Sequence, residues 1–401
     1  MFRKVDSLLL GLTLGLTLFG LAMIASVSVF ESYQISTRLV QQGVLTEPTN
    51  AFYLWRNFWH VLGGLILMSI TAVIPYRVWE KLAPPLFVGS LLLLLALFIP
   101  GIGADYGTSR SWLSVGPFSV QPSEFVKLTL ILYLAVWLQK REQLIQTLQE
   151  GFYPFVVLLT ITTFLLALQP DFGSVLVLSC IAITMFFIAG GNTVHILVGG
   201  TLSAALSLPF ILSKAYVRAR FLAFLNSDDP TLSEGIGFQI KQALIAVGSG
   251  RLFGQGYGKS VQKFGYLPEV QSDMIFAAMG EELGFFRLCI ILLLYSTLVV
   301  RSLRVARLAP DRFGLLVASG ISAWIGFQSI INIGGNLSLM PLTGITLPLI
   351  SYGGSSQWAV LAAIGILLNI SAHSAEAGAR TRRSPIRTSL HPLLARRMTR
   401  S

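Results

Sequence analysis

The sequence predicts an all-α polytopic membrane protein with about ten transmembrane helices. Of its 401 residues, 54% are hydrophobic and only 12% are charged, whereas about a quarter of a soluble domain is charged. Apolar runs of about twenty residues recur along the chain, and each is long enough to cross ~30 Å of hydrocarbon as a helix. Lys and Arg gather in alternate connecting segments, as expected for a chain that crosses a membrane repeatedly. These observations exclude an ordinary soluble globular protein.

The expected helices follow directly from these apolar runs. The first run comes after Arg3 and Lys4, as in a signal peptide, but at roughly 24 residues it is longer than the apolar region of one. We therefore expect it to be retained as a helix. In chain order, the expected transmembrane helices cover residues 7–30, 57–76, 82–100, 122–139, 152–168, 172–190, 194–213, 274–299, 313–334 and 352–371.

The distribution of basic residues places both termini in the cytoplasm. With that orientation, more than half of the 29 Lys and Arg residues lie in inside segments, and the outside loops at 169–171 and 335–351 hold none. We expect a membrane domain over residues 1–372 and a basic, disordered cytoplasmic tail over 373–401, where anionic lipid attracts it. The net charge of +11 is thus explained by topology and tail, and it is weak evidence for nucleic acid binding.

One outside segment, the large loop at 215–272, is basic against this trend. Long loops translocate regardless of their charge, but the basic surface also suits an anionic ligand, and both interpretations stay open. Apolar residues at helical spacing near 236–249 predict a short interfacial helix within the loop. The glycines at 248–258 indicate turn-rich backbone and lack the spacing of a nucleotide-binding P-loop.

Cysteine and histidine give no sign of a disulfide framework or of a metal centre. Cys180 and Cys289 both lie inside apolar runs. The four histidines are scattered without the spacing of metal ligands, so neither zinc nor haem is expected.

Four polar segments fall on one side of the membrane when the helices are counted. They connect helices three and four, five and six, seven and eight, and nine and ten, and all open to the outer face. The segments are 103–127, the "QPDFG" stretch with Asp171, the "YLPEVQSD" stretch, and 340–356. This arrangement predicts one extracytoplasmic site built from segments that are far apart in the sequence.

Charged residues near the helix ends are candidates for that site. Glu124 and Lys127 are three residues apart at the start of a helix, so they share a face and can pair. Each charge deep in a membrane costs roughly 2.5–3.5 kcal/mol on insertion scales, which disfavours an unpaired one. The pair either joins helix ends or lines a polar cavity. Glu281 and Glu282 lie inside helix eight, and we expect Glu281 to face the bundle, since it continues the face that holds Gly280.

Asp273 is the strongest candidate for chemistry. It lies at the outer N-terminus of helix eight, after a basic loop rich in Pro and Gly, and the helix dipole there favours its ionised form. Glu269, four residues earlier, is expected to shape or neutralise the basic loop.

Several long stretches resemble the SEDS family (shape, elongation, division and sporulation), whose members include FtsW, RodA and SpoVE. They are "SRSWLSVGPFSVQPSEFVKL", "QPDFGSVLVL", "GFQIKQALIAVGSGRLFGQGYGKSVQKFGYLPEVQSDMIFAAMGEELGF" and "MPLTGITLPLISYGGSS". The "SVQKFGYLPE" stretch is closer to FtsW than to RodA. The resemblance implies a peptidoglycan glycosyltransferase of the bacterial cytoplasmic (inner) membrane, which polymerises lipid II into glycan strands at the outer face.

The resemblance also assigns site residues. The family's essential aspartate falls on Asp273, its glutamate and lysine pair on Glu124 and Lys127, and the arginine before its "WL" on Arg110. The chain departs from the family pattern at Arg287, which stands where Gly is usual, and at Gln271 and Met274.

A single general base suffices for the implied reaction, because undecaprenyl pyrophosphate is already a good leaving group. We assign the base to Asp273, with inversion at the sugar carbon. Basic groups or a divalent cation (Mg or Mn) would stabilise the departing pyrophosphate, and no organic cofactor is expected. The candidate substrate contacts, beside Glu124, Lys127, Asp171 and Glu269, are Arg110, Arg218, Arg220 and Lys263.

Two other functional classes remain open, a flippase for the lipid-linked precursor and a non-catalytic scaffold for cell-wall enzymes. Intramembrane charge pairs suit a transporter too, but the polar segments lie at one face and no inverted repeat is visible. A scaffold would not need Asp273. The resemblance further implies membrane lipids and a class B penicillin-binding transpeptidase as partners, and leaves a role in division, elongation or sporulation undecided.

Overall fold

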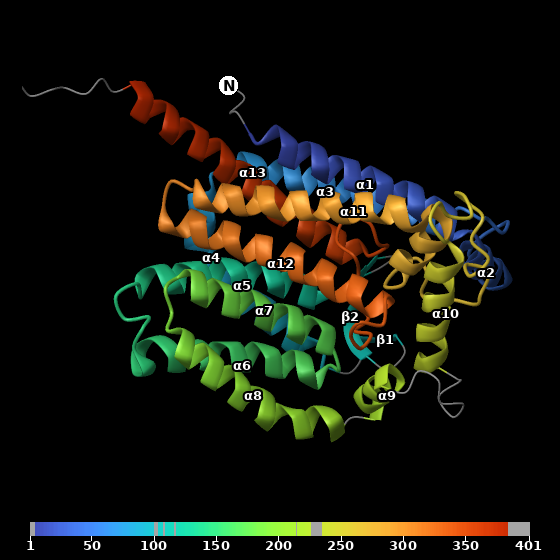
Figure 1. Cartoon of the computed structure of the whole chain (residues 1–401), viewed down its shortest axis with the longest axis horizontal. Helices are drawn as coiled ribbons and strands as arrows, with labels where there is room; N and C mark the ends of the chain where they lie inside the picture. Colours follow the sequence, from blue (N-terminus) through green and yellow to red (C-terminus); the bar gives the residue numbers. More distant parts are fainter. Residues whose placement is uncertain are drawn as a thin grey trace, which may run out of the picture.

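The computed structural model describes residues 5–99, 103–106, 109–115, 118–213, 215–225 and 235–383. Its long helices form a bundle, and both described ends of the chain lie at the same end of it (Figure 1). The short helices, the strands and the long loops gather at the opposite end. The polar segments therefore share one end of the bundle, opposite the termini, as counting helices predicts.

Each of the expected apolar runs coincides with a helix. They are α1 (Ser7–Val27), α3 (Phe52–Val73), α4 (Tyr76–Ala96), α5 (Pro122–Lys140), α6 (Tyr153–Leu168), α7 (Phe172–Ile188), α8 (Thr193–Ser213), α11 (Ile275–Arg307), α12 (Arg312–Asn336) and α13 (Gly354–Arg383). Among the described residues, six helical stretches are long and apolar enough to cross a membrane: Ser7–Val27, Tyr76–Ala96, Leu148–Leu168, Ile275–Arg307, Arg312–Asn336 and Gly354–Ala375. The helical, multi-pass class is confirmed, whereas the exact number of ten crossings is not.

Some elements have no counterpart in the expectations from the sequence. A helix α2 (Val29–Gln41) follows α1, and a π-helical turn (Leu148–Phe152) precedes α6. The segment between α4 and α5, expected to be a loop, forms an antiparallel sheet in the order β1-β2-β3. Its strands are β1 (Gly103–Tyr106), β2 (Ser109–Val115) and β3 (Phe118–Val120).

The large loop contains α9 (Ala215–Leu225) and α10 (Ile236–Ser249), and the latter is the helix that the apolar spacing predicts. At the other end of the chain, α13 continues to Arg383, so the first part of the predicted tail extends the last helix. Residues 384–401 lie outside the described part of the chain.

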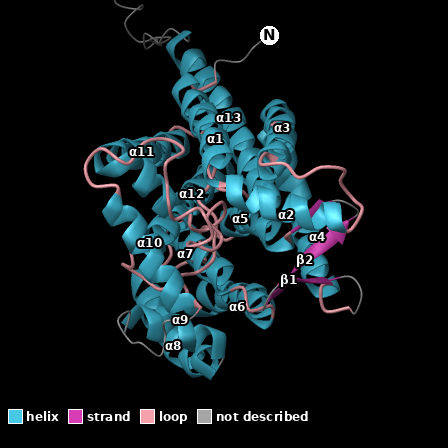
Figure 2. Ribbon diagram, turned by 90° about the vertical axis from the view of Figure 1, so that its right-hand side faces the viewer, coloured by secondary structure: helices cyan, strands magenta, loops and turns pink. Residues whose placement is uncertain are grey.

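The core is centred on α12, most of which is buried between α5, α7, α11 and α13. Small residues let these helices approach closely. A β-carbon at Gly320 of α12 would lie 2.7 Å from Ile131 of α5 and 2.7 Å from Met185 of α7. Seen from the end that carries the loops, α12 lies beside a group of loops between α5, α7 and α10 (Figure 2).

α11 is broken at Gly284, whose φ of 76° and ψ of 176° are not helical. The segment 251–256 runs beside the break and bonds the main-chain groups that the break exposes. The Gln255 and Gly256 amides donate to the Glu281 and Glu282 carbonyls at 2.9 and 3.0 Å. Arg287, the unusual charge in this helix, donates to the Phe253 carbonyl at 2.6 Å and to the Leu283 carbonyl at 3.2 Å. The break therefore fastens the large loop to α11.

Candidate active site

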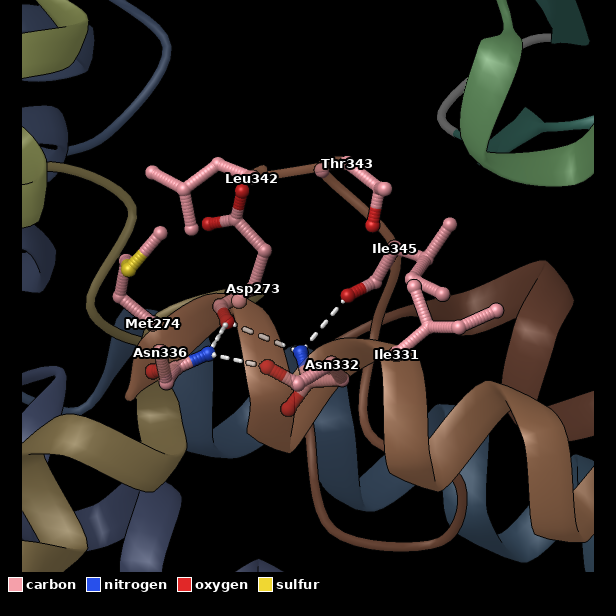
Figure 3. A pocket seen from close by; sticks show the side chains of 10 residues that line it. Asp273, Met274, Ile331, Asn332, Asn336, Leu342, Thr343 and Ile345 are labelled. Atoms are coloured by element: carbon pink, nitrogen blue, oxygen red, sulfur yellow. Dashed lines mark hydrogen bonds between the residues drawn. The ribbon is translucent and has the colours of Figure 1, made fainter. Parts of the chain in front are cut away.

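A small pocket opens at Asp273, in the turn that precedes α11 (Figure 3). Its walls come from three segments that are distant in the sequence. They are the turn at Asp273 and Met274, the C-terminal part of α12 from Ile331 to Asn336, and residues Leu342–Ile345 of the loop between α12 and α13. The packing of α11 against α12 thus brings together two of the four polar segments.

The main chain at Asp273 is held by two amides of α12. Asn332 Nδ2 donates to the Asp273 carbonyl at 2.9 Å, and Asn336 Nδ2 donates to the same oxygen at 2.8 Å. Asn336 Oδ1 also accepts from the Ala277 amide at 3.0 Å, in the first turn of α11, and this amide is shared with the Met274 carbonyl at 3.1 Å. The start of α11 is therefore anchored to α12 by side-chain amides.

The Asp273 carboxyl group combines burial with an unused acceptor. Oδ1 is buried and accepts no hydrogen bond from the described residues, although the residue as a whole stays partly accessible. Burial, assisted by the nearby Glu269 carboxylate, raises the pKa of Asp273 to about 7, while Arg220 opposes the rise. A carboxyl group with such a pKa is partly ionised near neutral pH, which suits a general base.

Arg220, on α9, is a cation whose charge acts on this carboxyl group. A β-carbon at Gly344 would lie 3.3 Å from Arg220 Nη2 and 3.8 Å from Asp273 Oδ2, so both groups flank this glycine. Arg220 Nη1 donates to the Leu342 carbonyl at 2.8 Å. Burial lowers the pKa of Arg220, and the carboxylates of Asp273 and Asp171 counteract that shift.

Asp171 is fixed as the N-cap of α7. Its Oδ1 accepts from the Ser174 amide at 3.1 Å, and its Oδ2 accepts from Gln121 Nε2 at 3.3 Å. The "QPDFG" segment is thereby joined to the start of α5. Asp171 also acts on the pKa of Arg220, so the "QPDFG" segment belongs to the same electrostatic site as the Asp273 turn. Through Gln121, the segment 103–127 is joined to that site as well.

Glu124 and Lys127 form the predicted pair, with Nζ 2.8 Å from Oε1, and both side chains are buried. Lys127 Nζ also donates to Gln328 Oε1 at 2.8 Å and lies over the Trp324 ring. Gln328 Nε2 in turn donates to the Thr346 carbonyl at 2.9 Å. The pair therefore connects α5, through α12, to the loop that borders the pocket, and neither residue lines the pocket itself.

Lys263 occupies a different position from the one expected of a substrate contact. Its Nζ lies 3.1 Å from Glu282 Oε1 and donates to the Gly258 carbonyl at 2.7 Å. Its side chain is 3% exposed and that of Glu282 is 0% exposed. The ammonium group is thus enclosed within the large loop, at a distance from the pocket lining, because α11 presents a carboxylate to it.

The two glutamates of helix eight hold the large loop in place. Glu281 is buried, as expected, and accepts from the Val261 amide at 3.0 Å and the Gln262 amide at 3.3 Å. Glu282 accepts from the Ser26 hydroxyl of α1 at 2.7 Å in addition to Lys263. Carboxylates are therefore concentrated here because they satisfy loop amides, hydroxyls and a buried ammonium group.

The remaining candidates lie around the site. Glu269, with a φ of 53°, is exposed, and its carboxylate accepts from the Ser272 hydroxyl at 2.8 Å. Arg218 is exposed on α9. Arg110 belongs to β2, but its side chain lies outside the described part of the structure. The residues that sequence reasoning missed are Asn332, Asn336 and Gln328, although their spacing of four within an apolar helix was visible.

Comparison with known proteins gives a match along nearly the whole chain. The family model FTSW_RODA_SPOVE, described as "Cell cycle protein", matches residues 6–376. Stage V sporulation protein E of Bacillus subtilis is 40% identical over 371 residues, which cover 92% of this chain and 97% of that protein. A protein of Trichlorobacter lovleyi named "Probable peptidoglycan glycosyltransferase FtsW" is 39% identical over 370 residues, 92% of this chain and 93% of that one.

A solved structure shares the architecture. It is a chain from a study of polymerization and crosslinking by a peptidoglycan synthase complex, with a TM-score of 0.74 and 28% sequence identity. The match covers 93% of this chain and 99% of the solved one.

Proposed function

The chain belongs to the FtsW, RodA and SpoVE family of cell cycle proteins, and we propose that its Asp273 pocket carries out the chemistry of that family. The protein is a peptidoglycan glycosyltransferase, a multi-pass membrane enzyme that polymerises lipid II into glycan strands. The observation that supports Asp273 as the reacting group is its buried carboxylate oxygen, which has no hydrogen-bond partner among the described residues. Burial and the nearby Glu269 carboxylate raise the pKa of this group to about 7.

In the proposed step, Asp273 removes the proton from a sugar hydroxyl of the acceptor. The hydroxyl oxygen then forms a bond to the anomeric carbon of the donor, as the bond from that carbon to the pyrophosphate oxygen breaks. The bonding electrons leave with undecaprenyl pyrophosphate, so no second acid is needed, and a single displacement inverts the anomeric carbon. The proton stays on Asp273 until water removes it, which restores the base for the next acceptor.

Negative charge develops on the departing pyrophosphate, and a fixed cation near the carboxylate stabilises it. Arg220 is the cation that the geometry favours, since the Leu342 carbonyl orients it beside the pocket. Arg218 and Arg110 are further candidates, on α9 and β2. Glu124, Lys127 and Lys263 support the site through other residues and are not proposed to contact substrate.

A divalent cation such as Mg or Mn would fit the pyrophosphate chemistry, but the residues that the structure describes do not by themselves form a site for it. Among the described residues, no three His, Cys, Asp or Glu side chains form a group that could hold a metal ion. We therefore derive no step through a metal.

The site is proposed to face outward from the bacterial cytoplasmic membrane. Support comes from the basic inner segments, and from the position of the pocket at the end of the bundle opposite the termini. A class B penicillin-binding transpeptidase is the proposed partner, because the similar solved chain belongs to a study of a complex that couples polymerization to crosslinking.

The test uses purified protein with and without its cognate transpeptidase, given lipid II and a divalent cation. We expect Asp273→Asn to lower the polymerisation rate by about 10²–10⁴-fold, the contribution typical of a general base. Asp311→Asn is the matched control, because Asp311 caps α12 through the Gly314 amide, and Asn caps helices as well as Asp does.

Equal rates for wild type and Asp273→Asn at equal thermal stability would remove Asp273 from the mechanism. No polymer from any variant, with lipid II transported across vesicles instead, would favour the flippase. Activity of the partner that depends on the presence of this protein but not on Asp273 would favour the scaffold.

A further inference from the structure

One face of α12 carries polar side chains along its C-terminal half. Trp324, Gln328, Asn332 and Asn336 follow at intervals of four, so they lie in a row on one side of the helix. All four are buried. Polar groups inside a membrane protein are costly unless they bond to something, so this row is expected to have specific partners. We call these residues the α12 polar row.

Asn332 bonds two segments at once. Its Nδ2 donates to the Asp273 carbonyl at 2.9 Å and to the Ile345 carbonyl at 2.7 Å (Figure 3). Because both partners are acceptors, the amide nitrogen must face them, and the orientation of the side chain is fixed. Its Oδ1 is buried and has no hydrogen-bond partner among the described residues, which is an energetic cost. The Asn332 amide thus connects the turn at Asp273 to the opposite wall of the pocket, while its own Oδ1 is left without a hydrogen bond from the described residues.

Gln328 bonds the same wall one turn earlier. It donates to the Thr346 carbonyl at 2.9 Å and accepts from Lys127 Nζ at 2.8 Å and from Trp324 Nε1 at 2.7 Å. The segment from Leu342 to Thr346 is therefore fixed to α12 at two successive carbonyl groups. The Glu124–Lys127 pair supports this attachment from α5.

The fixed segment also sets the position of the cation. Its Leu342 carbonyl accepts from Arg220, and its Gly344, with a φ of 74°, lies between Arg220 and the Asp273 carboxylate. A displacement of this segment would change the separation of base and cation together. The relative position of these two groups thus depends on the α12 polar row.

We propose that Asn332 is a positioning residue for glycosyl transfer, which ties the Asp273 turn to the Leu342–Thr346 segment so that the base and Arg220 keep a fixed geometry. This inference rests on the proposed role of Asp273. Asn332 itself does not touch the reacting atoms. Asn336 donates a second hydrogen bond to the Asp273 carbonyl, and Gln328 donates to the Thr346 carbonyl of the opposite wall.

The test compares Asn332→Ala with Asn369→Ala in the full-length protein. Asn369 is a matched control, since it is a buried amide on α13 that donates to the Ala72 carbonyl at 2.6 Å and accepts from the Tyr76 amide at 2.9 Å, remote from the pocket. We expect Asn332→Ala to lower kcat for lipid II polymerisation by about 10²-fold, as a misplacement of about 1 Å can do, with KM little changed. The pH midpoint of the rate should also fall, because a loosened Asp273 turn admits water to the carboxylate.

Asn369→Ala is assayed at the same interval below its own unfolding temperature as Asn332→Ala. It is expected to keep the kcat and the pH midpoint of the wild type. The proposal is overturned if Asn332→Ala keeps the wild-type kcat, or if both variants lose kcat equally with no change in pH midpoint. If Asn332→Ala does not fold, Asn336→Ala takes its place, because it removes one of the two donors to the Asp273 carbonyl. It is expected to lower kcat by a smaller factor than Asn332→Ala. An unchanged kcat in Asn336→Ala would then refute the positioning role. Asp273→Asn separates the two hypotheses: if that variant stays active, the base assignment fails, whatever Asn332 does.

Discussion

Replacing Lys263 by Met removes the ammonium group from a buried ion pair while keeping most of the aliphatic length. The Nζ of Lys263 lies 3.1 Å from Glu282 Oε1, and the two side chains are 3% and 0% exposed. Removing one partner of a buried pair costs about 3–5 kcal/mol, because the remaining charge loses its compensation. Glu282 keeps the Ser26 hydroxyl at 2.7 Å, so we expect a loss near the lower end, about 3 kcal/mol.

A double variant separates structural loss from loss of a substrate contact. Replacing both partners by apolar residues is often neutral, so Lys263→Met with Glu282→Met should be at least as stable as Lys263→Met alone. The assays are unfolding in detergent micelles and lipid II polymerisation at a temperature below every unfolding transition. If Lys263 acts only through Glu282 and the loop, polymerisation should recover in parallel with stability.

Two outcomes would refute this reasoning. A Lys263→Met variant as stable as the wild type would mean that the buried pair does not hold the large loop. A double variant that is stable but inactive, while Glu282→Met alone is active, would return Lys263 to the substrate contacts that the sequence suggested.

Two further predictions concern pH and the break in α11. Because burial and Glu269 raise the pKa of Asp273 to about 7, and a base must be ionised to act, kcat/KM should rise with pH through about 7. Glu269→Gln removes the negative neighbour and should move that rise to lower pH, and an unchanged midpoint would contradict the electrostatic account. Gly284→Ala should destabilise the protein by at least ~1–3 kcal/mol, because its φ of 76° and ψ of 176° suit only glycine and its β-carbon would lie 2.1 Å from the Gly254 nitrogen. Gly326→Ala on α12 is the control for the unfolding measurements, since its β-carbon would meet Val299 at ordinary distances of 3.6 and 3.7 Å. Equal losses of unfolding free energy in both variants would refute the requirement for glycine at the break.

The sequence predicted those residues of the candidate site whose charge is unusual in an apolar stretch. Asp273 was visible because it ends a basic loop and begins a long apolar helix, and the Glu124–Lys127 pair because three residues in a helix bring two side chains to one face. The burial of Glu281 was likewise predicted by the face that it shares with Gly280, which packs against Val247 of α10.

Other parts of the site had no local signal. The role of Lys263 depended on Glu282, which lies on another element, and the break at Gly284 lets the segment 251–256 of the large loop bond to α11. Asn332 was an unremarkable amide until its two carbonyl partners, at Asp273 and Ile345, were known. The sheet between α4 and α5 was missed because its strands are short and glycines, Gly107 and Gly116, stand between them in the sequence.

The sequence by itself determined the class of protein, the helices, and the end of the bundle at which the polar segments meet. These follow from composition and from periodic, local hydrogen bonding, because a chain in hydrocarbon must satisfy its backbone within each helix. Only the tertiary structure decided which charged group lines the pocket and which charges bind one another. Such pairings depend on how helices pack, and the contact between Lys127 and Gln328 joins residues that are 201 positions apart in the chain.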